Sequence, residues 1–196
     1  MKEASIDMMY DQELEEVKQT LKNGGTILFP TDTTWSLGCD ATNAKAVAKL
    51  LELKEYPTDL SFILLVDSTD TIKKYVKHLH PKIETLLVYH QRPLTVVYDR
   101  AKNLPAEVVA SDGSVAIRIP QDDYCIYLLR AFGKPIVTTT ANESTNPLPD
   151  CFAEISEDIK KKADFISTRR RKETALNDPS VIVRLSPRTE LVFLRE

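Results

Sequence analysis

Short, continuously apolar segments alternate with longer helical patterns along this chain, and this alternation restricts its fold more than any other feature. The segment FILLV, Phe62–Val66, has no polar face and is too short for a buried helix. It is predicted to be a central strand that is covered on both sides. The same reasoning predicts further strands at Thr26–Pro30, Leu94–Tyr98, Val115–Pro120, Pro135–Thr139, Ser180–Leu185 and Glu190–Leu194.

Helical periodicity fills the intervals between these strands. Helices are predicted over Asp11–Lys22, from a cap at Thr42 to Pro57, over Thr69–Tyr89 with a break near Pro81, and around Cys125–Phe132 with an end at Gly133. No internal repeat or low-complexity linker divides the 196 residues. We therefore expect one α/β domain over residues 1–196, in which helices flank both faces of a mixed sheet.

Composition excludes several classes of protein. With 42% hydrophobic residues, a net charge of -3 and no long apolar run, the chain fits a globular protein without a membrane span or a signal segment. We expect it to be cytoplasmic and without a membrane partner. Its three cysteines and three histidines lack metal-ligand spacing, so no metal site is predicted. The basic groups Lys160–Lys162 and Arg169–Lys172 indicate either an RNA-binding surface or, as an alternative, a solvated helix end and loop.

Two predicted strands open into polar segments that are candidates for one shared site. PTDTTW follows one strand at Pro30–Trp35, and TTTAN lies at the end of another at Thr138–Asn142. Ligands of α/β sheets bind beyond the strand ends, and hydroxyl and amide groups suit phosphate, carboxylate or ribose. The alternative is that Thr138 and Thr139 are ordinary strand residues and Asn142 forms a local turn. No glycine-rich phosphate loop and no serine-nucleophile motif occurs.

Four longer segments carry a family resemblance. FPTDTTWSLGCDATNAKAVAKLLELK, SVAIRIP, LLRAFGKPIVTTTAN and DPSVIVRL occur in this order between Gly24 and Leu185. Together they resemble the YrdC family of threonylcarbamoyl-AMP synthases, including its YciO-type relatives.

The resemblance implies a fold and a reaction. The fold is a YrdC-like twisted mixed sheet flanked by helices, with a concave ligand face. The reaction joins L-threonine, bicarbonate or CO2, and ATP into L-threonylcarbamoyladenylate and pyrophosphate, a nucleotidyl transfer that serves N6-threonylcarbamoyladenosine synthesis in tRNA. Magnesium would arrive with the ATP. RNA or tRNA-modification partners are also implied.

The family motifs assign roles to nine positions. As the resemblance implies, Lys54 and Arg118 are catalytic cations, and Thr31, Thr33 and Ser114 bind the substrate. The nucleotide-binding positions are Lys54, Thr140, Ala141, Asn142 and Ser180. Structural alternatives stay open: Thr31 and Thr33 form a turn, Arg118 pairs with Asp122 or Asp123 at the surface, and Ser180 caps a strand.

The sequence also departs from the family pattern. Tyr56 stands where the Lys-x-Arg motif has arginine, and Leu60 stands where a further lysine is expected. A phenol cannot reproduce the bidentate grip of a guanidinium on an anion. Arg92 and His90 replace a glycine and a tryptophan of the pattern, and Trp35 is either a ligand platform or a core residue. The alternative function is therefore a diverged YciO-type protein that binds nucleotide or double-stranded RNA with weak or no synthase activity.

Overall fold

A mixed sheet of nine strands runs through the part of the chain that the computed structural model describes, residues 2–54, 62–143, 146–174 and 178–196. Its spatial order is β7-β1-β2-β6-β3-β5-β4-β8-β9. The strands are β1 (Ile27–Pro30), β2 (Trp35–Asp40), β3 (Ile63–Leu65), β4 (Leu94–Tyr98), β5 (Val115–Arg118), β6 (Ile136–Thr140), β7 (Phe165–Ile166), β8 (Val181–Leu185) and β9 (Leu191–Arg195). Three pairs are parallel (β1 with β7, β3 with β5, β4 with β8) and the other five are antiparallel, which confirms the mixed α/β fold.

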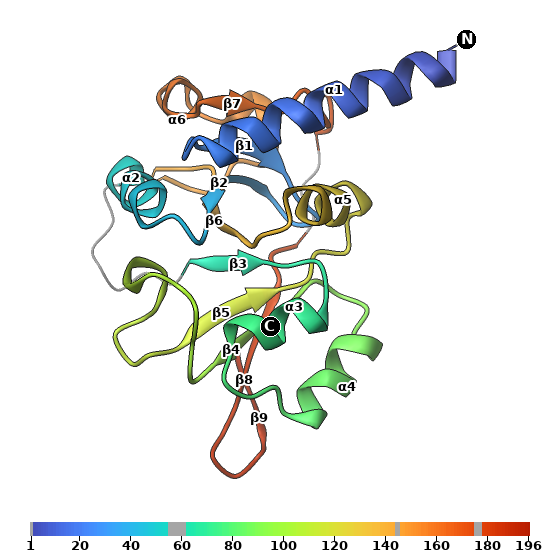
Figure 1. The fold of residues 1–196 in the computed structure, drawn as a ribbon. Coiled ribbons are helices and arrows are strands. Elements are labelled where there is room, and N and C mark those ends of the chain that lie inside the picture. Colours follow the sequence, from blue (N-terminus) through green and yellow to red (C-terminus); the bar gives the residue numbers. More distant parts are fainter. Residues whose placement is uncertain (1, 55–61, 144–145, 175–177) are drawn as a thin grey trace.

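Six α-helices and two 3-10 helices accompany the strands in the described residues. They are α1 (Lys2–Lys22), α2 (Ala44–Lys54), α3 (Thr69–Tyr75), α4 (Pro81–Tyr89), α5 (Asp123–Phe132), α6 (Glu157–Lys162), η1 (Ala106–Val108) and η2 (Phe152–Glu154). Figure 1 shows α1, α5 and α6 around one end of the sheet, while α3 and α4 lie near the other end, from which the β8–β9 hairpin projects.

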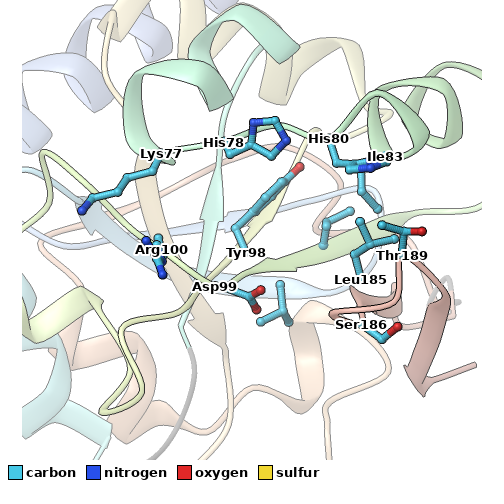
Figure 2. Close-up of a pocket in the computed structure, with 12 residues that line it drawn as sticks. Lys77, His78, His80, Ile83, Tyr98, Asp99, Arg100, Leu185, Ser186 and Thr189 are labelled. Atoms are coloured by element: carbon cyan, nitrogen blue, oxygen red, sulfur yellow. The ribbon is translucent and has the colours of Figure 1, made fainter.

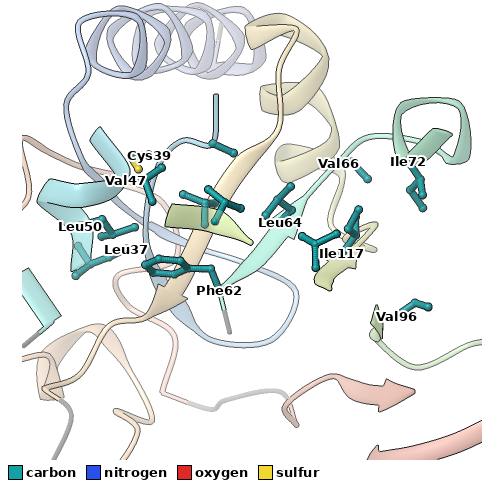
Figure 3. Close-up of a cluster of buried hydrophobic side chains, with 14 of the residues drawn as sticks. Leu37, Cys39, Val47, Leu50, Phe62, Leu64, Val66, Ile72, Val96 and Ile117 are labelled. Atoms are coloured by element: carbon teal, nitrogen blue, oxygen red, sulfur yellow. The ribbon is translucent and has the colours of Figure 1, made fainter. Parts of the chain in front are cut away.

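Two hydrophobic clusters show that helices cover both faces of the sheet. On one face, α1 and α5 pack on strand residues that include Phe29, Leu65 and Ile136. On the other face, α2, α3 and α4 pack on residues such as Leu37, Leu64 and Ile117, several of which are drawn in Figure 3. Successive strand residues alternate between the two clusters because side chains point to opposite faces with a period of two. Each large buried side chain contributes about 1.5–3 kcal/mol.

The predicted helices are present, with corrections to their limits. The cap of α2 is Asn43, whose Oδ1 accepts from the N–H groups of Lys45 and Ala46, and the predicted cap Thr42 instead hydrogen-bonds to Asp40. Pro57 lies outside the described residues. The helical stretch broken near Pro81 consists of two helices, α3 and α4. At α5, Asp122 caps the first turn and Gly133 ends the helix with a left-handed φ of 76°.

Strand β2 was not anticipated from the sequence. Its residues WSLGCD look half polar, yet all six are buried because β1 and β6 pair on either side and helices cover the faces. Gly38 lies at its centre, and a Cβ there would come within 2.9 Å of Ile136. The chain therefore needs a glycine where β2 passes between its neighbours.

In the basic segment late in the chain, two arginine side chains pack against aromatic rings of the protein. Lys160–Lys162 forms the last turn of α6, as the helix-end alternative predicted. The guanidinium of Arg169 lies 4.1 Å from the ring centroid of Tyr124, and that of Arg171 lies 4.8 Å from Phe152. Among the described residues, none of the helices has the length and apolar character needed to cross a membrane.

Candidate active site

The turn between β1 and β2 is a compact cluster of threonine hydroxyls. Thr31 Oγ1 lies 3.1 Å from Thr33 Oγ1 and donates to the carbonyl of Thr34 at 2.8 Å. It also accepts from the N–H groups of Thr33 and Thr34. All four residues Thr31–Thr34 are buried, although loops usually lie at the surface. Thr31 and Thr33 do form a turn, and the same turn faces a buried cation.

That cation is Arg118, at the end of β5. Its Nη1 donates to Thr33 Oγ1 at 2.8 Å and lies 3.1 Å from Asp32 Oδ1, while its Nη2 is 3.5 Å from Thr31 Oγ1. The residue is only 3% exposed, so the alternative of a surface pairing with Asp122 or Asp123 is wrong. Burial lowers the pKa of Arg118, and Asp32 opposes this effect.

One donor of Arg118 remains available. Its Nε is buried and has no hydrogen-bond partner among the described residues. A buried N–H without a partner costs about 1–3 kcal/mol, and charged donors cost more. An anionic ligand beside the Thr31–Thr34 turn would recover this cost.

The second polar strand exit, Thr140–Asn142, is organised around Lys54 at the end of α2. Lys54 Nζ donates to the carbonyl oxygens of Thr140 (2.8 Å) and Asn142, and to Asn142 Oδ1 at 3.2 Å. Thr140 Oγ1 also donates to Asn142 Oδ1 at 2.6 Å. The lysine is only 1% exposed, and burial lowers its pKa to about 8. Lys54 therefore holds this turn in place.

The two polar exits meet, as the sequence led us to expect. Strands β2 and β6 pair antiparallel with Ser36 opposite Thr140. Just beyond this pair, the N–H of Ala141 donates to the carbonyl of Trp35 at 3.0 Å. The Thr31–Thr34 turn and the Thr140–Asn142 turn therefore lie at the same end of these strands.

Ser180 belongs to a third group that extends toward the C-terminus. Ser180 Oγ lies 2.8 Å from Thr95 Oγ1, and Arg195 donates to both the carbonyl and the hydroxyl of Ser180. Thr95 is the register partner of Arg118 across β4 and β5. Burial, and then the positive charge of Arg118, lower the pKa of Arg195. Two guanidinium groups are thus close enough to repel each other, which is an arrangement suited to an anion.

Ser114 stands apart from these groups, and the indole ring of Trp35 packs against an aromatic side chain. The N–H of Ser114 donates to Asp112 and its carbonyl accepts from Ala110, both in the turn that precedes β5. It lies at the opposite end of β5 from Arg118. Trp35 is 5% exposed and packs on Phe152 with ring centroids 4.8 Å apart, which favours the core alternative.

Arg170 closes the outer side of the threonine turn. Its Nη1 donates to the carbonyl of Thr31 at 2.6 Å, and its Nε donates to Glu173 at 2.6 Å. The hollow between this arginine and Thr31, Thr33 and Trp35 has a volume of about 10 Å³. That is space for about one water molecule, so a larger ligand seated there must displace Arg170.

Several residues were missed from the sequence, and two departures stay untested. Asp32, Thr95 and Arg195 were not anticipated because their contacts depend on distant segments, although Asp32 lies inside the PTDTTW motif. Arg170 was named only as part of the basic segment, without its contact to Thr31. Tyr56 and Leu60 lie outside the described residues. The side chain of Arg92 is exposed. Over the described ranges, no three histidine, cysteine or acidic side chains are grouped so as to hold a metal ion.

Comparison with known proteins assigns the family. The family model of Sua5, YciO and YrdC proteins, described as Telomere recombination, matches residues 19–196. The chain belongs to this family. A threonylcarbamoyl-AMP synthase of Riesia pediculicola is 34% identical over 142 residues, which cover 70% of this chain and 76% of that protein. One of Vibrio campbellii is 28% identical over 171 residues, which cover 86% of this chain and 91% of that protein.

Solved structures of family members share the fold. A P. abyssi Sua5 complexed with L-threonine has a TM-score of 0.81 and 25% identity, and the match covers 93% of this chain and 53% of that one. The chain thus spans about half the length of that Sua5. E. coli YciO has a TM-score of 0.78 and 21% identity, with 93% of this chain and 88% of that one covered, which shows a shared fold. The expected YrdC-like sheet is confirmed.

Proposed function

We propose that this protein is a threonylcarbamoyl-AMP synthase, which forms L-threonylcarbamoyladenylate and pyrophosphate from L-threonine, bicarbonate or CO2, and ATP. The observation that carries the proposal is the buried Arg118, which is bound to Thr33 and Asp32 and whose Nε has no hydrogen-bond partner among the described residues. Several curated relatives carry this enzyme name. The product would serve N6-threonylcarbamoyladenosine synthesis in tRNA.

The reaction needs orientation and charge neutralisation rather than a covalent nucleophile. A carbamate oxygen attacks the α-phosphate of ATP, and pyrophosphate leaves. We assign Thr31, Thr33 and Arg118 to the carboxylate and hydroxyl of threonine, since a guanidinium and hydroxyls are the donors that these groups accept from. This matches the ligand named for the P. abyssi Sua5 structure.

The nucleotide is assigned to the second turn and to the C-terminal group. Thr140, Ala141 and Asn142 would line its phosphates, while Lys54 positions their turn and adds positive charge. Ser180, with Arg195 beside it, would bind the anionic groups that leave. Mg²⁺ would enter with ATP as part of the substrate. Ser114 has no role in this assignment, because its hydrogen bonds lie in its own turn.

A second candidate is favoured by one observation. The ammonium of Lys54 donates to three oxygen atoms of the protein itself, which is the arrangement expected if it holds a turn without taking part in transfer. With Tyr56 and Leu60 in place of basic residues, this describes a YciO-type relative that binds nucleotide or double-stranded RNA with weak or no synthase activity.

Pyrophosphate release from ATP, with and without threonine and bicarbonate, tests the proposal. We expect threonine-dependent release that falls about 10- to 100-fold in Thr33→Val and Arg118→Lys, as the loss of a charged hydrogen bond predicts. The KM for threonine should rise in both variants. Thr20→Val, on α1, is the matched control.

Pyrophosphate release that does not depend on threonine would refute the synthase assignment. Activity that is seen only after Tyr56→Arg would instead establish the second candidate. In that event, ATP binding measured by calorimetry should persist in the unmodified protein and weaken in Asn142→Ala.

A further inference from the structure

A second hollow, of about 380 Å³, is lined by none of the proposed catalytic or substrate-binding residues. It sits between the α3–α4 connection, the ends of β4 and β8, and the β8–β9 turn (Figure 2). Strand β4 contributes to both the proposed catalytic site and the hollow. Thr95 contacts Ser180 of the proposed site, while Tyr98, about 10 Å further along the strand, lines the hollow. Its volume falls within the range of small-molecule sites, about 300–1,000 Å³.

The floor of the hollow is apolar. Ile83, Val96 and the ring of Tyr98 are buried, and Leu185 completes the surface. In Figure 2, Ile83, Leu185 and Thr189 stand on one side, and Lys77 and Arg100 on the other. Such a floor accepts the apolar body of a ligand.

The hydroxyl of Tyr98 is buried at the hollow without a hydrogen-bond partner among the described residues. Tyr98 is 6% exposed, and its hydroxyl has no partner among the described residues. Figure 2 shows it directed toward the space between His78 and His80. Burial raises the pKa of Tyr98, so the hydroxyl keeps its proton and is a donor. Buried hydroxyls are normally hydrogen-bonded, and one without a partner indicates a ligand group or an ordered water.

Donors and positive charge surround the same space. The Nδ1 of His80 accepts from the N–H of Lys82, so in the neutral ring the other nitrogen, Nε2, is a donor. The N-terminus of α4 begins at Pro81 and adds its partial positive charge. Lys77 and Arg100 line the rim, and the one carboxylate among the lining residues, Asp99, accepts from Arg184 at 2.8 Å. The surroundings favour an anion.

We propose that this hollow is a second binding site, for a small organic anion with an apolar body. The carboxylate or phosphate of the ligand would accept from the Tyr98 hydroxyl and the His80 ring near the start of α4. Its apolar body would cover Ile83 and Leu185. This site is independent of the synthase activity proposed above.

The three histidines of the chain make the test specific. His78 and His80 line the hollow, whereas His90 lies at the other end of α4. Imidazole signals would be followed by NMR during titration with benzoate, phenyl phosphate, inorganic phosphate or benzyl alcohol. We expect one or both aromatic anions to shift His78 and His80 but not His90, with at least 10-fold tighter binding than inorganic phosphate and benzyl alcohol.

Variants of the lining residues test whether these side chains bind the ligand. Tyr98→Phe removes one oxygen that has no partner, so it should leave the melting temperature unchanged or raised, while weakening binding at least 10-fold. Arg100→Gln, at an exposed position, should also weaken it, and Arg130→Gln, an exposed cation on α5, should not. The proposal is overturned if neither aromatic anion shifts His78 and His80, if benzyl alcohol binds equally well, or if Tyr98→Phe binds like the unmodified protein.

Discussion

At the scale of single residues, Lys54 shows how a charged group becomes part of the fold. Its ammonium is buried and binds the carbonyl oxygens of Thr140 and Asn142, so those oxygens lose their partner if the side chain is removed. Burial holds the pKa of Lys54 at about 8, below the 10.5 of an unperturbed lysine. The unfolded chain therefore binds a proton more tightly than the native chain does.

This difference predicts a pH dependence of stability. Between pH 8 and 10.5 the unfolded state binds more protons at Lys54 than the native state does. The contribution of Lys54 to the free energy of unfolding therefore rises with pH in this window and is lost as pH falls toward 8. The difference in unfolding free energy between the unmodified protein and Lys54→Met, measured by urea denaturation, should therefore increase across this window. Lys45→Met, at an exposed position of α2, controls for the loss of a lysine side chain. A constant difference would contradict the prediction.

The sequence around Arg118 indicates which face of the sheet its side chain is on, but not its partners. Alternation in VAIRIP places Arg118 opposite Ile117 and Ile119, and both isoleucines do pack in the other cluster. The ion pair with Asp32 depends on how the turn after β1 meets β5, and local patterns contain no information about such long-range contacts. Arg195 was missed for a similar reason, because it ends an exposed, mostly apolar strand.

At the scale of elements, Glu13 joins α1 to the segment that follows β7. Its carboxylate accepts from the hydroxyl of Ser167 at 2.6 Å, from the N–H and hydroxyl of Thr168, and from Tyr124 at 3.3 Å. Glu13 is 8% exposed, so these bonds are shielded from water. Glu13 is therefore one of the contacts that hold residues 167–171, and with them Arg170, in place.

Glu13→Gln should loosen this connection. The amide keeps the shape but replaces one acceptor oxygen with a donor, so we expect a loss of about 1.5–3 kcal/mol in unfolding free energy. Hydrogen exchange should accelerate at the N–H groups of Thr168 and Arg169, which bond to Glu13 and to Ser167. Glu16→Gln, on the exposed side of α1, is the control. Unchanged exchange at these two amides would show that Glu13 is not the anchor.

Element types were easier to predict than their limits. FILLV and LTVVY are strands because β-branched and apolar residues fit a sheet that is covered on both faces. Strand β2 was missed because burial there is imposed by its neighbours, while Trp35, Ser36, Gly38 and Asp40 give no strand pattern of their own. The cap of α2 was off by one residue because threonine and asparagine are both good caps and only geometry chooses between them.

At the scale of the whole molecule, the two edges of the sheet differ. One edge is β7, a strand of two residues. The other is β9, where Val192, Phe193 and Leu194 are 44%, 49% and 56% exposed. In the described part of the chain, β9 pairs with β8 alone. Short edge strands resist pairing with other chains, whereas long apolar ones promote it.

Leu194→Lys should therefore reduce any self-association that takes place through β9. A lysine on the edge strand repels a second copy and leaves the fold intact, with a stability change within about 0.5 kcal/mol. Sedimentation velocity over a range of concentrations measures the effect, and Tyr127→Lys, at an exposed position of α5, is the matched control. Equal association of both variants and the unmodified protein would exclude β9 as the contact.

The contact between Arg170 and the carbonyl of Thr31 links the C-terminal third of the chain to its first hairpin. Any molecule that takes the place of this guanidinium severs that link while it binds. Entry of a substrate and release of the Arg170 side chain are then one event. A protease that cleaves after arginine should therefore cut at Arg170 faster in the substrate-bound protein than in the free protein.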